Sequence, residues 1–97
     1  MRIRYTLPAL ADLGSILDCI AEHSPQGAER VQTRIQTVIK LLAQNPHIGV
    51  RTDDATIRRL TMLPYPYLVF YEVTKDEIII HAVRHAARDP STMPGSG

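Results

Sequence analysis

The chain of 97 residues has room for one small domain with a single hydrophobic core. Hydrophobic residues make up 44% of it and charged residues 22%, the balance of an ordinary folded domain and not of a disordered chain. Its single cysteine excludes an internal disulfide and a zinc site built on CxxC pairs. No apolar run is long enough for a transmembrane helix or a signal peptide, so we expect a cytoplasmic protein that does not enter the membrane.

The net charge of +1 is unevenly distributed along the chain. Residues 1–29 contain two arginines and four acidic residues, a net charge of −2. Residues 30–97 contain nine basic and six acidic residues, a net charge of +3. The second part is therefore where we expect a surface that meets phosphate groups or an acidic partner.

The beginning of the chain predicts a short strand and a first helix. Residues 2–5 alternate polar and apolar side chains, as a half-buried strand does. Thr6 is a suitable N-cap, and Pro8 fits the first turn of a helix that ends near His23. The apolar face of this helix follows a three- and four-residue spacing and comprises Leu10, Leu13, Ile16, Leu17 and Ile20. Cys19 flanks that face, and we expect it to fill a small space in the core.

A second helix is predicted immediately after the first. Ser24-Pro25 combines a capping residue with a proline suited to the first helical turn, and Asn45-Pro46 ends the element. Its apolar stripe comprises Ala28, Val31, Ile35, Val38, Ile39 and Leu42. Because the connection is so short, the two helices are expected to pack as an antiparallel hairpin.

The second half of the chain predicts a polar loop and three strands. The loop covers residues 46–56, and the strands run from Ile57 to Leu63, from Tyr67 to Val73, and from Ile78 to Arg84 or His85. The middle strand is apolar on both faces, which predicts a central place in the sheet. Residues 90–97 are rich in proline, glycine and serine and predict a flexible tail after a single domain of residues 1–89.

The predicted element order is β-α-α-β-β-β. Such an order predicts an α+β fold, with the helical hairpin packed on one face of a small, mostly antiparallel, four-stranded sheet.

Three segments of the sequence resemble the ParE/RelE superfamily of toxins from type II toxin–antitoxin systems. "IRYTLPALADLGSILDCI" (residues 3–20) is similar to the first strand and helix of that family. "RRLTMLPYPYLVFYEV" (residues 58–73) resembles the arginine, Tyr-Pro-Tyr and Val-Phe-Tyr hairpin of its ParE-like members, which are known for plasmid stabilisation. "IIIHAVRHAARDP" (residues 78–90) resembles their last strand with its His-x-x-Arg-Asp ending.

The resemblance implies a toxin that a cognate antitoxin protein neutralises, and it leaves three functions open. ParE-like toxins inhibit DNA gyrase by binding it and need no catalytic residues, and this is the function we favour. RelE-like toxins are endoribonucleases that cut messenger RNA on the ribosome. A degenerate member of the family would keep the fold and the ability to bind its antitoxin but would no longer be toxic. None of the three requires a cofactor.

If the chain is a ribonuclease, it needs an acid, a base and cations around the scissile phosphate. The candidate catalytic residues are Arg59, Glu72, Arg84 and His85. The lysine cluster and C-terminal tyrosine of RelE-like toxins have no counterpart here, because residues 51–59 contain three arginines and no lysine and no tyrosine follows Tyr71.

A second set of candidates would bind the target or the antitoxin. It comprises Arg58, Arg59, Tyr71, Arg84, His85 and Arg88. Side chains alternate along a strand, so only one of Arg58 and Arg59 can face a groove on the sheet. Packing in the sheet is the simpler interpretation of Tyr71 and Tyr67.

No metal site is predicted. His81 and His85 lie four residues apart on a strand, about 13 Å at 3.3 Å per residue, which is too far to share one zinc ion. We expect His81 to be a surface side chain of the sheet and His85, at the strand end, to be the better candidate for a site.

Overall fold

A computed structural model describes residues 1–88, and of Arg88 only the backbone. The predicted flexible tail, residues 90–97, lies outside the described residues. In chain order the elements are β1 (Arg2–Tyr5), α1 (Leu7–His23), α2 (Pro25–Gln44), β2 (Val50–Arg51), β3 (Ile57–Thr61), β4 (Tyr67–Val73), β5 (Glu77–His85) and the short 3₁₀ helix η1 (Ala86–Arg88). The predicted α+β class, with two helices packed on a mostly antiparallel sheet, is confirmed.

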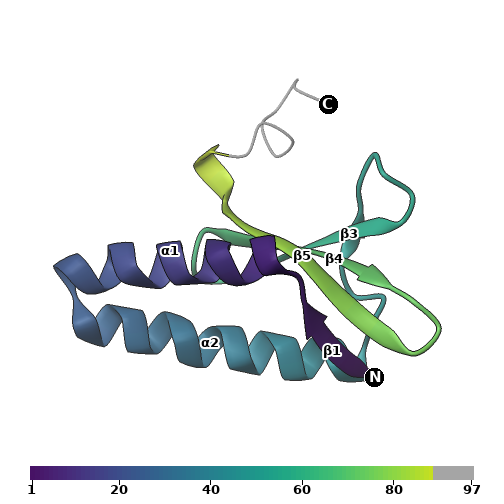
Figure 1. Cartoon of the computed structure of the whole chain (residues 1–97), viewed down its shortest axis with the longest axis horizontal. Coiled ribbons are helices and arrows are strands. Elements are labelled where there is room, and N and C mark those ends of the chain that lie inside the picture. Colours follow the sequence, from purple (N-terminus) through teal and green to yellow (C-terminus); the bar gives the residue numbers. More distant parts are fainter. Residues whose placement is uncertain (89–97) are drawn as a thin grey trace.

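The sheet has five strands, in the order β1-β5-β4-β3-β2. Figure 1 labels all of them except the two-residue strand β2. The apolar strand β4 is central, as its sequence predicts. β1 runs parallel to β5, and the other three pairs are antiparallel. The parallel pairing of β1 with β5 is possible because no tight turn joins them: the helical hairpin and strands β2 to β4 lie between them in the chain. After the hairpin the chain enters the sheet at the opposite edge, with β2.

The prediction of four strands is wrong by one short edge strand. Val50 and Arg51 pair with Arg59 and Arg58 inside the segment that its polar composition predicts to be a loop. Two residues are too few to show an alternating pattern, so this strand depends on its neighbour β3 and not on its own sequence.

Both helices begin and end where the capping residues predict. The Thr6 hydroxyl accepts a hydrogen bond from the Ala9 amide at 3.2 Å and donates one to the Ile80 carbonyl in β5 at 3.1 Å. Ser24 ends α1 and caps α2, where its hydroxyl accepts the Gly27 amide at 3.0 Å. The helices therefore lie side by side (Figure 1), and neither is long and apolar enough to span a bilayer.

The core lies between the helical hairpin and one face of the sheet. Its buried members come from both layers and include Ala9, Val31, Ile35, Val38, Leu42, Val69, Tyr71, Ile78, Ile80 and Val83. Cys19 is not among them: it is exposed, which corrects the expectation that it fills the core. It lies on the helix stripe of Ser15 and Glu22, both exposed, and not on the stripe that faces the sheet.

Candidate functional site

The face of the sheet turned away from the helices carries three of the four candidate catalytic residues, Arg59, Glu72 and Arg84. Val69 and Tyr71 point into the core, so Phe70 and Glu72 point to the opposite face. Residues paired across strands share a face, and the pairs Arg59–Phe70 and Arg84–Leu68 therefore place both arginines on the same side as Glu72. We call this side of the sheet the open face.

Arg58 and Arg59 are separated as alternation requires. Arg58 pairs with Tyr71 and shares the helix side of the sheet. Its Nη1 donates to the Gly49 carbonyl at 2.9 Å and to the His47 carbonyl at 3.4 Å, so the guanidinium holds the segment that precedes β2. Arg59 lies on the open face, where it is paired with Phe70 of β4, and its side chain is half-buried.

Glu72 contacts a side chain that was not among the predicted site residues, His81. His81 Nε2 lies 2.9 Å from Glu72 Oε1, and both side chains are partly exposed on the open face. Asp54 is nearby: hydrogen bonds from the Thr56 amide and hydroxyl lower the pKa of its carboxyl, and the charge of His81 lowers that pKa further. The open face thus combines an imidazole and a carboxylate in contact. Arg59, on the neighbouring strand β3, lies diagonal to Glu72.

A β-bulge in β5 lies at His81. Phe70 pairs with Ala82 and the next residue of β4, Tyr71, pairs with Ile80, which leaves His81 as the extra residue of β5. An extra residue bends its strand and redirects its side chain. Even a regular register counted from the Val73–Ile78 pair would place His81 opposite Phe70 and diagonal to Glu72, so alternation along β5 was a signal available in the sequence.

Arg84 and His85 point to opposite sides of the sheet. Arg84 is exposed on the open face, whereas His85 pairs with Tyr67 on the helix side. The two rings meet edge to face, with centroids 5.5 Å apart and planes at 88°. His85 Nδ1 accepts the Ala87 amide at 3.1 Å, which leaves Nε2 as the nitrogen that can carry a proton in the neutral ring.

The structure does not bring the four candidate catalytic residues together. Glu72 and Arg59 are neighbours on the open face. Arg84 pairs opposite Leu68, four residues and about 13 Å along β4 from Glu72. His85 is one residue farther and on the other side of the sheet.

Tyr71 is a structural residue in this fold. Its side chain is completely buried, its hydroxyl donates to the Pro46 carbonyl at 2.9 Å, and it accepts the Gly49 amide at 2.8 Å. Burial raises the pKa of the phenol, and the Gly49 hydrogen bond and the charge of Arg58 lower it by less. Tyr71 therefore has no exposed surface to offer a partner. Of Arg88, the last candidate, the structure gives the backbone in η1 and no side-chain position.

This arrangement of a helical hairpin on a small sheet matches a known family of proteins. Residues 3–90 match the family model described as ParE toxin of type II toxin-antitoxin system, parDE. The chain belongs to this ParE toxin family.

Individual relatives carry names from both branches of the superfamily. The chain is 40% identical over 87 residues to Toxin RelE2 of Caulobacter vibrioides, which covers 90% of this chain and 97% of that protein. Among solved structures, a chain of the chromosomal ParDE toxin–antitoxin system of P. aeruginosa superposes with a TM-score of 0.74 at 26% identity, covering 88% of this chain and 95% of that one. YafQ of E. coli shares the fold, with a TM-score of 0.61 at 14% identity over 90% of this chain and 96% of its own.

Proposed function

We propose that this toxin inhibits DNA gyrase by binding to it, and that a cognate antitoxin protein neutralises it. The observation that supports the proposal is the separation of the candidate catalytic groups: Arg84 and Glu72 lie about 13 Å apart along β4, and His85 is on the other side of the sheet. Acid–base cleavage of RNA needs its acid and base within reach of one phosphate. A toxin that acts by binding has no such requirement.

The test is to add the purified, antitoxin-free chain to DNA gyrase and to follow supercoiling and DNA cleavage on one gel. We expect supercoiling to be inhibited and gyrase-linked DNA breaks to accumulate. Addition of the antitoxin before gyrase should abolish both effects. Normal supercoiling without cleaved DNA, from protein that circular dichroism shows to be folded, would reject the proposal.

Ribosome-dependent cleavage of messenger RNA is the second candidate function, and one observation favours it. His81 and Glu72 form a 2.9 Å contact on the open face beside Arg59, so an imidazole, a carboxylate and a guanidinium lie on one surface. A histidine oriented by a carboxylate is a suitable general acid or base.

The two candidates make different demands on Glu72 and His81. Cleavage of messenger RNA in a translating extract should fall by roughly a hundredfold or more in Glu72→Gln or His81→Ala if these residues perform acid–base catalysis. Inhibition of gyrase by the same two variants should stay within about threefold of the wild-type value if the chain acts by binding elsewhere.

A further inference from the structure

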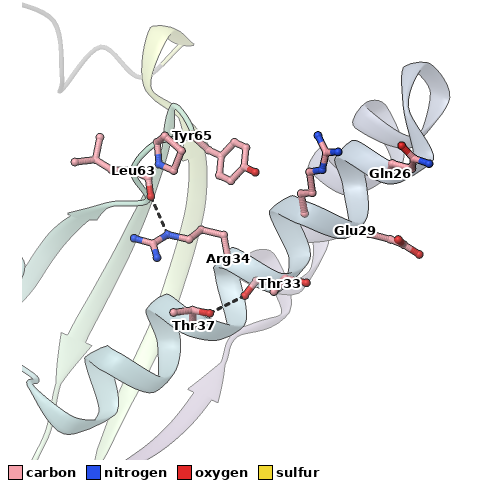
Figure 2. Close-up of a pocket in the computed structure, with 9 residues that line it drawn as sticks. Gln26, Glu29, Thr33, Arg34, Thr37, Leu63 and Tyr65 are labelled. Atoms are coloured by element: carbon pink, nitrogen blue, oxygen red, sulfur yellow. Dashed lines mark hydrogen bonds between the residues drawn. The ribbon is translucent and has the colours of Figure 1, made fainter.

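A groove of about 910 Å³ lies between α2 and the turn that joins β3 to β4 (Figure 2). One wall is the flank of α2 from Gln26 to Thr37, and the other is Leu63, Pro64 and Tyr65. At 1.5 Å per residue this flank is about 16 Å long, and the groove is open to solvent along it. Its shape suits an extended or helical peptide segment of several residues better than a compact small molecule.

The helix wall carries two arginines, Arg30 and Arg34, whose side chains line the groove. Arg34 crosses the groove, and its Nε donates to the Leu63 carbonyl at 2.8 Å (Figure 2). Within the described part of the chain, its terminal nitrogens make no hydrogen bond. Arg30, one turn earlier, is exposed and has no hydrogen bond or ion pair with any residue in the range 1–88 that the structure describes. Glu29 lines the same wall, so the groove has a small net positive charge.

The opposite wall is mostly hydrocarbon. Leu63 is 66% exposed, and Tyr65 is half-buried where it packs against the core. A nucleic-acid backbone is usually held by several convergent cations and backbone amides. This groove offers a helix flank, one carboxylate and an apolar wall. A protein segment with a carboxylate on one side and an apolar side chain on the other matches both walls.

The turn that forms the apolar wall also contacts the end of β5, where Arg84 and His85 lie. The Pro66 carbonyl accepts the Ala86 amide at 2.8 Å, and the rings of Tyr67 and His85 pack edge to face. The apolar wall of the groove and the end of β5 are thus adjacent in the fold. A protein that binds at Arg84 and extends past the turn would enter the groove.

We propose that the groove binds an acidic segment of DNA gyrase that also carries an apolar side chain. A carboxylate of this segment pairs with Arg30 and with the terminal nitrogens of Arg34, and its apolar side chain packs on Leu63 and Tyr65. The inference rests on gyrase as the target of the toxin, and it adds a second contact region, on the helix side of the molecule.

The experiment compares charge reversals at two exposed positions of the same helix. Arg30→Glu reverses a charge in the groove, and Lys40→Glu makes the same change ten residues later, outside it. We expect Arg30→Glu to raise the toxin concentration that half-inhibits supercoiling by about tenfold or more and Lys40→Glu to change it by less than about twofold. Leu63→Ser should raise it about fivefold, compared with Leu7→Ser at another exposed leucine.

Each other outcome has a definite meaning, provided that the four variants unfold in urea at similar midpoints. Equal inhibition by Arg30→Glu and Lys40→Glu overturns the inference while leaving gyrase as the target. If Arg30→Glu weakens binding of the antitoxin or of a single-stranded DNA oligonucleotide and leaves gyrase inhibition unchanged, the groove belongs to that ligand and the inference is wrong. A wild-type chain with no effect on gyrase rejects the proposed function itself, and this inference with it.

Discussion

Tyr71 and Gly49 show how single residues connect the central strand to the segment before β2. The Tyr71 hydroxyl is hydrogen-bonded to the Gly49 amide, and a Cβ atom at Gly49 would lie 2.5 Å from that hydroxyl oxygen. Glycine is therefore required here by the close approach of a side chain, and no unusual backbone angle is involved.

We predict that Gly49→Ala lowers the free energy of unfolding by about 1–3 kcal/mol, because the added methyl group must displace the buried phenol or break its hydrogen bonds. Gly14→Ala is the matched control, since a Cβ at Gly14, in α1, meets no atom within 4 Å. That variant should be neutral or more stable by up to about 1 kcal/mol, as alanine is the better helix former. Urea denaturation measures both, and equal stabilities would contradict the assigned contact.

A second prediction at the residue scale concerns pH. Burial raises the pKa of Tyr71 in the folded protein above its ordinary value of 10.0, and the unfolded chain therefore loses this proton first as the pH rises. The stability that the protonated phenol contributes is complete below pH 10.0 and is lost as the pH rises through the folded pKa.

The free energy of unfolding should therefore decrease with pH above about 10, and Tyr71→Phe should make the decrease shallower. Part of the slope will remain, because burial also raises the pKa of Tyr5. Urea titrations at a series of pH values give the slope. A slope that is identical in wild type and Tyr71→Phe would show that Tyr71 ionises as easily folded as unfolded.

At the scale of elements, the packing of α1 on β5 includes a polar contact between Asp12 and the backbone of β5. The Asp12 carboxylate is only partly buried, and it accepts the Val83 amide at 3.0 Å, close to the bulge at His81. The contact gives the Val83 amide a partner on α1 at the point where the bulge disturbs the ladder between β4 and β5.

We predict that Asp12→Ala destabilises the fold by about 1–3 kcal/mol, since it leaves the Val83 amide without its partner. Asp18→Ala, in the same helix, removes an exposed carboxylate that has no bond to any described residue, and it should change stability by no more than about 0.5 kcal/mol. Hydrogen exchange of the Val83 amide supplies a local readout. Faster exchange is expected in Asp12→Ala alone, and unchanged exchange would show that this contact does not protect the amide.

Most elements could be predicted because their signals are local. The capping residues Thr6 and Ser24, the apolar stripes of the helices and the apolar strand β4 each give their position within a few neighbouring residues. β2 could not be predicted, because its two residues form a strand only by pairing with β3. Cys19 was misplaced because it adjoins the apolar stripe of α1 without belonging to it.

The candidate site was less predictable, because it depends on register and on contacts between distant segments. Alternation indicates that Arg84 and His85 face opposite sides, but the bulge at His81, which decides which of them lies on the open face, has no sequence signal of its own. The bond from Arg34 to the Leu63 carbonyl joins residues 29 positions apart, so the groove beside α2 appears only once the chain is folded.

At the scale of the whole molecule, the ends of the β4–β5 hairpin should differ in function. Arg84 lies at the end near η1, and Lys75 lies in the turn at the opposite end. Both side chains are exposed, and neither has an ion pair with another described residue. A charge reversal at either position changes the net charge by the same amount, so a general effect of charge on association would be equal for the two.

We predict that Arg84→Glu raises the concentration of toxin that half-inhibits gyrase by about tenfold, whereas Lys75→Glu leaves it within about twofold. The reason is positional: Arg84 lies at the end of β5 that adjoins the β3–β4 turn, and Lys75 is separated from it by the length of the hairpin. Titration of supercoiling with each variant, at two salt concentrations, is the measurement. The difference between the variants should shrink at high salt, because exposed charges are screened. Equal effects of both reversals would mean that gyrase responds to the net charge of the toxin and not to a surface at this end of the sheet.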